Sequence, residues 1–145
     1  MTLLLDDQLL GIVLRGDEVP APLSSDPTIA TTGYWYVRLC QAVLGVADRT
    51  GTLSGPFMAL ASGRREQAIA AALELPEEIG LVSLRELGPV IGRLRARHQL
   101  NILSVEALAA AVYLNATVAL SVSSPRLEDA MRAEGVSFQI VASMP

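Results

Sequence analysis

The chain has 145 residues, of which 51% are hydrophobic, and a formal net charge of −4 at pH 7. This length and apolar content suit one compact unit with its own core, so we predict a single domain over residues 1–145. The longest uninterrupted apolar run, Ala107 to Leu114, is far shorter than the roughly 18 residues that predict a membrane span. The negative charge gives no overall attraction for nucleic acid, so RNA binding would depend on a local basic patch.

The first residues and the cysteine content bear on the cellular compartment. No basic segment precedes Asp6 and Asp7, and these acids interrupt the chain before a long apolar stretch develops, so we expect no secretory signal. One cysteine, Cys40, cannot form an internal disulfide, and one histidine, His98, does not provide a Cys/His zinc cluster. These features predict a cytoplasmic protein.

In the N-terminal half, apolar runs and turn residues predict two strands and three helices. The run Thr2–Leu5 is almost wholly apolar and stops at two acids, which is typical of a short buried strand. Asp7, Thr31 or Thr32, and Ser62 are expected to cap the helices. The predicted elements are a strand at 2–5, a helix at 7–16, a loop at 17–27, a helix at 34–46, a strand at 51–54 and a helix at 62–75.

The C-terminal half alternates strand-like and helix-like segments. Ser104 and Pro125 are expected to begin helices. The helix predicted over 85–98 has an alternative start at Pro89, because Gly88-Pro89 interrupts its first turn. The predicted elements are strands at 79–84, 117–122 and 136–141, and helices at 85–98, at 104–114 and from 125 onward. Such alternation favours a mainly parallel central sheet covered by helices on both faces, which is a three-layer α/β/α architecture.

Acidic residues stand at two places where open α/β sheets often bind ligands. Asp6, followed by Asp7, comes directly after the first predicted strand, and Glu106 lies two residues after Ser104. Carboxylates at strand ends can hold a hard cation in the crevice of the sheet. Each acid also has a purely structural explanation, as a helix cap or as an anion near a helix N-terminus. The sequence leaves both explanations open.

Two further groups of residues have a structural and a functional interpretation. The run Tyr34-Trp35-Tyr36 holds three of the six aromatic residues and would anchor the core or a subunit interface, or stack bases. Arg38 is the only cation near it. Arginines 93, 95 and 97, with His98, lie near the end of one predicted helix, where they would be solvated or contact phosphate.

The order of segments resembles that of PIN-like domains, a family that includes metal-dependent ribonucleases and the toxins of many bacterial toxin–antitoxin pairs. The resemblance rests on Leu3-Leu4-Leu5-Asp6 and, more fully, on residues 84–141. Within 84–141 the matching parts are the helix end at 95–98, the run 103–111 with Glu106, the apolar run 116–121 and the turn at 133–136. The resemblance implies a PIN-like α/β fold.

In active members of that family, a cluster of carboxylates at the strand ends holds Mg²⁺ or Mn²⁺. By the resemblance, Asp6 matches the acid after the first strand, and Glu106 matches the acid of the later helix, with Asp7 as a supporting ligand. The acid after the second strand would fall near Leu60, and the acid after the fourth near Ser123 or Ser124, where this chain has none. The resemblance therefore implies an incomplete acidic metal site.

Three functions follow from these observations. The favoured one is a PIN-like domain that acts as a non-catalytic binding or regulatory module, with a second copy of the chain or a small protein as partner. The alternative is a Mg- or Mn-dependent ribonuclease of the toxin–antitoxin type that uses Asp6, Glu106 and Asp7, and a third carboxylate close to Asp6 and Glu106 would favour it. The third is a small-ligand binding protein, which would have a largely apolar pocket at the strand ends.

Overall fold

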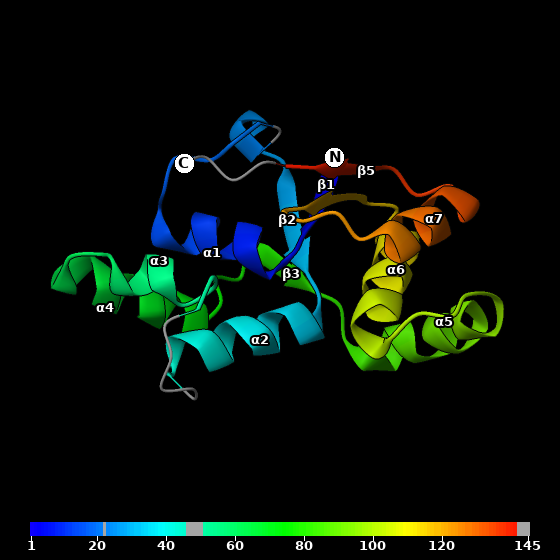
Figure 1. Cartoon of the computed structure of the whole chain (residues 1–145), viewed down its shortest axis with the longest axis horizontal. Helices are drawn as coiled ribbons and strands as arrows, with labels where there is room; N and C mark the ends of the chain where they lie inside the picture. The colour runs from blue at the N-terminus through cyan, green and yellow to red at the C-terminus, as the bar shows by residue number, and fades with distance from the viewer. Residues whose placement is uncertain (22, 46–50, 142–145) are drawn as a thin grey trace.

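A parallel β-sheet forms the centre of the molecule (Figure 1). The structure is a computed structural model that describes residues 1–21, 23–45 and 51–141. Over these residues the sheet has five strands in the order β3-β2-β1-β4-β5, and each strand runs parallel to its neighbours. The strands are β1 (Thr2–Leu5), β2 (Thr28–Thr31), β3 (Ile79–Leu81), β4 (Thr117–Leu120) and β5 (Phe138–Ile140).

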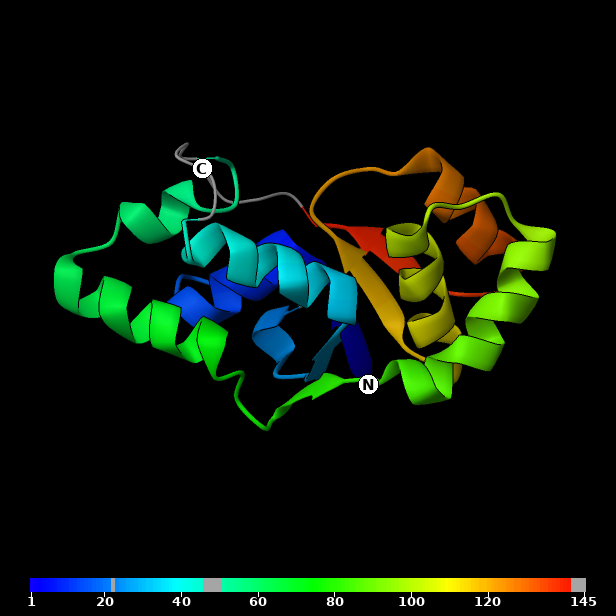
Figure 2. The same cartoon turned by 90° about the horizontal axis from the view of Figure 1, so that it is seen from below.

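Helices cover both faces of the sheet, which confirms the predicted three-layer α/β/α architecture (Figures 1 and 2). The first four helices lie on one side and the last three on the other (Figure 2). The helices are α1 (Asp7–Arg15), α2 (Gly33–Val43), α3 (Gly55–Met58), α4 (Ser62–Leu73), α5 (Leu84–Arg97), α6 (Ile102–Leu114) and α7 (Pro125–Ala133), with a short 3-10 helix at Leu23–Ser25.

The side chains of β1 divide the core between the two faces of the sheet. Leu4 packs with the layer of α5, α6 and α7, whereas Leu3 and Leu5 pack with α1 on the opposite face. All three leucines are fully buried, as expected for a central parallel strand covered on both sides. In α6 the buried residues run without a break from Val105 to Ala111, and four of them are alanines, which allow close packing on the sheet and on α5.

The helix caps differ by a few residues from those that the sequence predicts. Asp6, not Asp7, caps α1, because the Asp6 carboxylate accepts a hydrogen bond from the Leu9 N–H at 3.0 Å. Asn101, not Ser104, caps α6 in the same way, through the Ser104 N–H at 2.9 Å. In both cases the capping residue has an extended backbone, which lets its side chain reach the free N–H groups of the first turn.

Three other sequence predictions need correction. The prediction missed β2, and it placed a strand at 51–54, where residues 52–54 form a turn that leads into α3. The Gly51 N–H closes this turn by donating to the Ser54 hydroxyl oxygen at 2.8 Å. The alternative start of the next helix at Pro89 is wrong, because α5 begins at Leu84. Pro89 lies inside this helix, on its exposed side. The end predicted for α2, at residue 46, lies outside the described residues.

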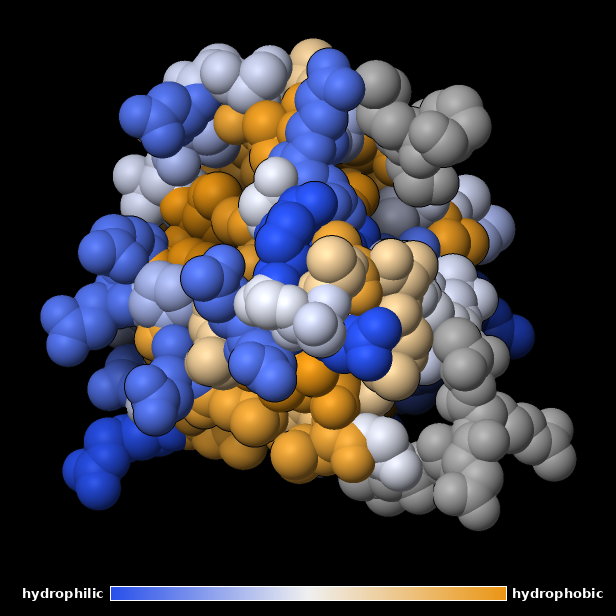
Figure 3. Space-filling model, turned by 90° about the vertical axis from the view of Figure 1, so that its left-hand side faces the viewer, coloured by the Kyte–Doolittle hydropathy of each residue, from blue (hydrophilic) through white to orange (hydrophobic). Residues whose placement is uncertain are grey.

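The end of the molecule formed by α3 and α4 has a mixed surface, with hydrophilic and hydrophobic areas side by side (Figure 3). Exposed Met58 and Leu73 lie on the same two helices as the exposed charges of Arg64 and Glu66. Among the described helices, none combines the length and the apolar character that crossing a membrane requires.

A cluster of charged side chains joins the end of α5 to the end of α7. Glu134 accepts a hydrogen bond from Arg97 Nη2 at 2.8 Å and lies 2.7 Å from Nε2 of His98. The hydrogen bond with His98, together with the nearby Arg97 guanidinium, holds the pKa of Glu134 below its usual value of 4.5. The cluster therefore favours the ionised form of Glu134 in the folded chain.

We predict that Glu134→Gln lowers the free energy of unfolding at pH 7 by no more than about 1 kcal/mol, because water screens such partly exposed pairs. A carboxyl group whose pKa is lowered by folding stabilises the protein above its usual pKa, and this contribution is lost as the pH falls through the folded value. Urea unfolding should show that the variant has a lower free energy of unfolding than wild type at pH 7, and that this difference becomes smaller at about pH 3. An equal difference at both pH values, or an equal effect of the exposed control Glu77→Gln, would contradict this role.

Candidate functional site

The order of strands places a hollow at the carboxyl ends of β1 and β4. The chain extends from β1 to β2 and β3 on one side and later returns to β4 and β5 on the other. In open α/β sheets, such a switch point is the usual position of a ligand crevice. A hollow of about 230 Å³ opens there, lined by Asp6, Asp7, Trp35, Arg38, Ser121 and Ser124 among others.

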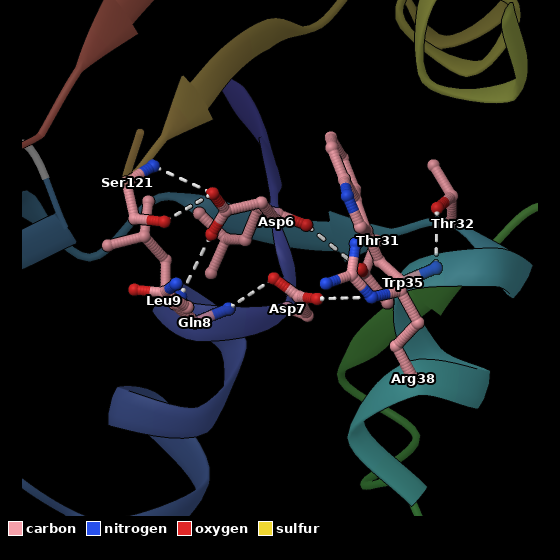
Figure 4. Close-up of polar contacts among 10 residues, drawn as sticks. Asp6, Asp7, Gln8, Leu9, Thr31, Thr32, Trp35, Arg38 and Ser121 are labelled. Atoms are coloured by element: carbon pink, nitrogen blue, oxygen red, sulfur yellow. Dashed lines mark hydrogen bonds and ion pairs between the residues drawn. The ribbon is translucent and has the colours of Figure 1, made fainter. Parts of the chain in front are cut away.

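Asp6 accepts hydrogen bonds from both sides of this switch point (Figure 4). One carboxylate oxygen receives the Leu9 N–H of α1, at 3.0 Å. The other receives both the N–H and the hydroxyl of Ser121, at 2.7 Å and 2.6 Å. Asp6 is only 6% exposed. Its carboxylate therefore caps α1 and at the same time ties the end of β1 to the end of β4.

Asp7 faces a cation from the neighbouring helix (Figure 4). One of its oxygens lies 3.2 Å from Nε of Arg38, although this contact lacks the alignment of a hydrogen bond. Burial raises the pKa of Asp7 above its usual value of 3.8; Arg38 opposes this rise and Asp6 adds to it. The positive charge that balances the two acids here is thus a guanidinium of the chain itself.

The threonines and aromatic residues near β2 have structural roles. The Thr31 hydroxyl donates to the Leu5 carbonyl at 2.9 Å, and the Thr32 hydroxyl oxygen caps α2 by accepting the Trp35 N–H at 3.2 Å. Trp35 is 5% exposed and packs in the core, while the Tyr36 hydroxyl donates to the Ala72 carbonyl at 2.7 Å. Two of the three aromatic side chains of the run 34–36 therefore anchor the core.

Glu106 is buried beside the N-terminus of α2, with an exposed fraction of 1%. Its Oε1 accepts the Tyr34 N–H at 2.8 Å, and no group in the described part of the chain bonds to its Oε2. Glu106 lines a second hollow, which it shares with Gly33 and Leu81, and it does not line the hollow of Asp6. The acids that the sequence analysis paired thus line two separate hollows.

The segment after β4 contains serines in place of an acid. The first carboxylate that follows, Glu128 in α7, turns back to this segment and accepts hydrogen bonds from the Ser123 hydroxyl and the Ser124 N–H, both at 2.7 Å. The hydrogen bond from Ser123 is the main cause of the lowered pKa of Glu128. Glu128 therefore satisfies the first turn of its own helix.

The donor groups of the first hollow do not fit a site built from several carboxylates around a divalent cation. Asp6 uses both oxygens in hydrogen bonds, and Asp7 faces Arg38. Over the described part of the chain, no three His, Cys, Asp or Glu side chains come together as a metal-binding group. The metal role of Asp6, Asp7 and Glu106 stays a prediction.

Sequence reasoning missed the two partners that define this hollow. The prediction places Ser121 inside a strand that runs to residue 122, whereas β4 ends at Leu120, so the position of Ser121 directly after a strand was hidden. Arg38 was noted only as a neighbour of the aromatic run. Its pairing with Asp7 depends on where α2 packs, and the sequence carries no local signal for that.

The fold is similar to that of a solved structure, VapBC-1 from nontypeable Haemophilus influenzae. The TM-score is 0.54 at 14% sequence identity, and the match covers 97% of this chain and 98% of that chain. The similarity is one of fold, and it agrees with the predicted PIN-like α/β architecture. No family model matches the sequence, and no curated protein matches it.

We predict unequal effects for substitution of the two neighbouring acids. Asp6→Asn should lower the free energy of unfolding at pH 7 by about 2 kcal/mol, because an amide N–H₂ would face a buried donor. Asp7→Asn should leave it unchanged or raise it by up to about 1 kcal/mol, because a buried carboxylate with a raised pKa is replaced by a neutral group.

The pH dependence of the Asp7 variant provides a second check. Because folding raises the pKa of Asp7, the resulting stabilisation is present below the usual pKa of 3.8 and is lost as the pH rises through the folded value. Wild type should therefore gain stability relative to Asp7→Asn when the pH falls from 7 to about 4. Urea unfolding measures both variants, and an Asp6→Asn protein as stable as Asp7→Asn would show that Asp6 does not tie the strands together.

Proposed function

We propose that residues 1–145 form a single PIN-like domain that acts as a binding or regulatory module and does not cleave RNA. The ion pair between Arg38 and Asp7 carries this proposal. The guanidinium of arginine stays charged at all pH values at which proteins are folded. It therefore supplies, beside the two acids, the positive charge that a metal ion would supply in a nuclease of the resembled family.

Electrostatics and hydrogen bonding both oppose a divalent cation at this place. A cation that approached Asp7 would be repelled by Arg38, which lies 3.2 Å from the nearer carboxylate oxygen. A cation that approached Asp6 would compete with three hydrogen bonds, two of them from Ser121. The hollow thus holds two carboxylates that already have partners in the chain, Asp6 in three hydrogen bonds and Asp7 in an ion pair with Arg38.

The observed strands support the loss of the acid cluster. Because the second strand is β2, the acid that follows the second strand in the resembled family is to be sought on α2 instead of near Leu60. Residues 32–43 contain no acid, and Arg38 is their only charged residue. After β4, the run Ser121–Ser124 has no acid either, and Glu128 is turned toward the backbone.

The alternative is a Mg- or Mn-dependent ribonuclease that works with Asp6, Asp7 and Glu106 alone. It needs these acids to act on one ion, whereas Glu106 lines a different hollow from the two aspartates. The division of the three acids between two hollows favours the non-catalytic proposal.

For the partner, we propose a protein, either a second copy of the chain or a small protein bound as in a toxin–antitoxin pair. The similarity in fold to VapBC-1 supports this choice. We also propose a cytoplasmic location, in agreement with the single cysteine.

We predict that the purified chain shows no metal-dependent RNA cleavage. The experiment incubates single-stranded and structured RNA with Mg²⁺ or Mn²⁺ and wild type, Asp6→Asn or Glu106→Gln. An equal background level of RNA cleavage with all three proteins supports the proposal. Metal-dependent cleavage by wild type that is lost in both variants would establish the ribonuclease instead.

A second prediction concerns Arg38 itself. Removing its charge in Arg38→Gln leaves Asp6 and Asp7 without a cation, so Mn²⁺ should stabilise this variant. The gain in free energy of unfolding is about 1.4 kcal/mol when Mn²⁺ is at roughly ten times its Kd. Thermal unfolding with and without Mn²⁺ measures the gain, with wild type and the exposed-arginine variant Arg93→Gln as controls. Equal stabilisation of all three proteins would show that Arg38 does not replace the metal.

A further inference from the structure

The second hollow lies at the edge of the sheet, where the N-terminus of α2, the end of β3 and the start of α5 meet (Figure 1). Its volume is about 430 Å³, and most of its lining is apolar. Val37, Leu81 and Leu84 form the rim and are 50%, 44% and 56% exposed. Small-molecule sites have this character, with apolar walls and a few placed polar groups.

The polar group of this hollow is the carboxylate of Glu106. Its Oε1 accepts the Tyr34 N–H, whereas Oε2 is buried and has no hydrogen-bond partner among the described residues. A buried carboxylate oxygen without a donor is unfavourable, so a donor at this position would be strongly preferred. None of the described residues that line the hollow is a cation.

Gly33 packs closely against this oxygen. A Cβ atom at Gly33 would lie 3.1 Å from Oε2 of Glu106, and the three atoms nearest to it would all belong to Glu106. The backbone of Gly33 has no positive φ that would require glycine, and glycine is a poor helix former. Glycine at this position thus lets the first turn of α2 approach the unpartnered oxygen without a side chain that crowds it.

We propose that this hollow binds a small apolar molecule that carries a protonated primary amine. The ammonium group donates to Oε2 of Glu106, and the apolar body packs against Val37, Leu81 and Leu84. A hydrogen bond between an ammonium and a carboxylate is about twice as strong as one between neutral groups, which favours an amine over a neutral donor. The inference goes beyond the proposed function and does not depend on the acids of the first hollow.

Benzylamine and benzyl alcohol test this site, because they share one shape and differ in the charge of the donor. In a ¹H–¹⁵N NMR titration, benzylamine should shift the amide signals of Gly33, Tyr34 and Leu84 with a Kd on the order of 1 mM. Benzyl alcohol should bind about tenfold more weakly. Equal affinity for the two compounds, or no saturable shift at these amides, would overturn the proposal.

Substitutions separate the contributions of charge and fold. Glu106→Gln should weaken benzylamine binding by about tenfold, to the level of the alcohol. Val37→Lys places a competing cation on the exposed rim and should also weaken benzylamine binding. This second variant tests the site even if Glu106→Gln does not fold. Val112→Lys, on a residue that is 41% exposed and does not line the hollow, is the matched control. A loss of affinity in Val112→Lys equal to that in Val37→Lys would count against the site.

Discussion

The carboxylate of Asp6 joins segments that are 115 residues apart in the chain. It ends β1, caps α1 and accepts two hydrogen bonds from Ser121 at the end of β4. Because the strand order reverses between β1 and β4, these bonds hold the point at which the two halves of the sheet meet. The first turn of α1 and the start of the serine run after β4, which line the first hollow, are held together by this connection.

A charge balance follows from that geometry. Two acids that follow a central strand are unfavourable when they are buried together, and the raised pKa of Asp7 reflects this burial. In a nuclease with this architecture a metal ion would offset the charge, whereas here Arg38 of α2 lies beside Asp7. The same fold can therefore support a binding or regulatory role without metal-dependent cleavage of RNA, since function depends on the site and not on the fold.

Glu106 illustrates how a single acid can belong to a different site from the one that its sequence position suggests. It lies on α6, whose alanines bring the helix close to the sheet and to α5. Its carboxylate then meets the N-terminus of α2, where Tyr34 donates to one oxygen and Gly33 packs closely against the other. The result is a largely apolar hollow with one charged group, quite unlike the polar hollow around Asp6.

The sequence by itself determined the fold class, four of the strands (β1, β3, β4 and β5) and all the longer helices (α1, α2 and α4 to α7), because apolar runs and turn residues act on neighbouring residues. It missed β2, in which Ile29 and Ala30 lie between threonines, because this strand is defined by its pairing with β1 and β3. It also identified Asp6, Asp7 and Glu106 as acids near strand and helix ends. Only the tertiary structure decided that Asp6 binds Ser121, that Asp7 faces Arg38 and that Glu106 faces Gly33. These contacts join residues far apart in the chain, and neither periodicity nor capping carries information over such a separation.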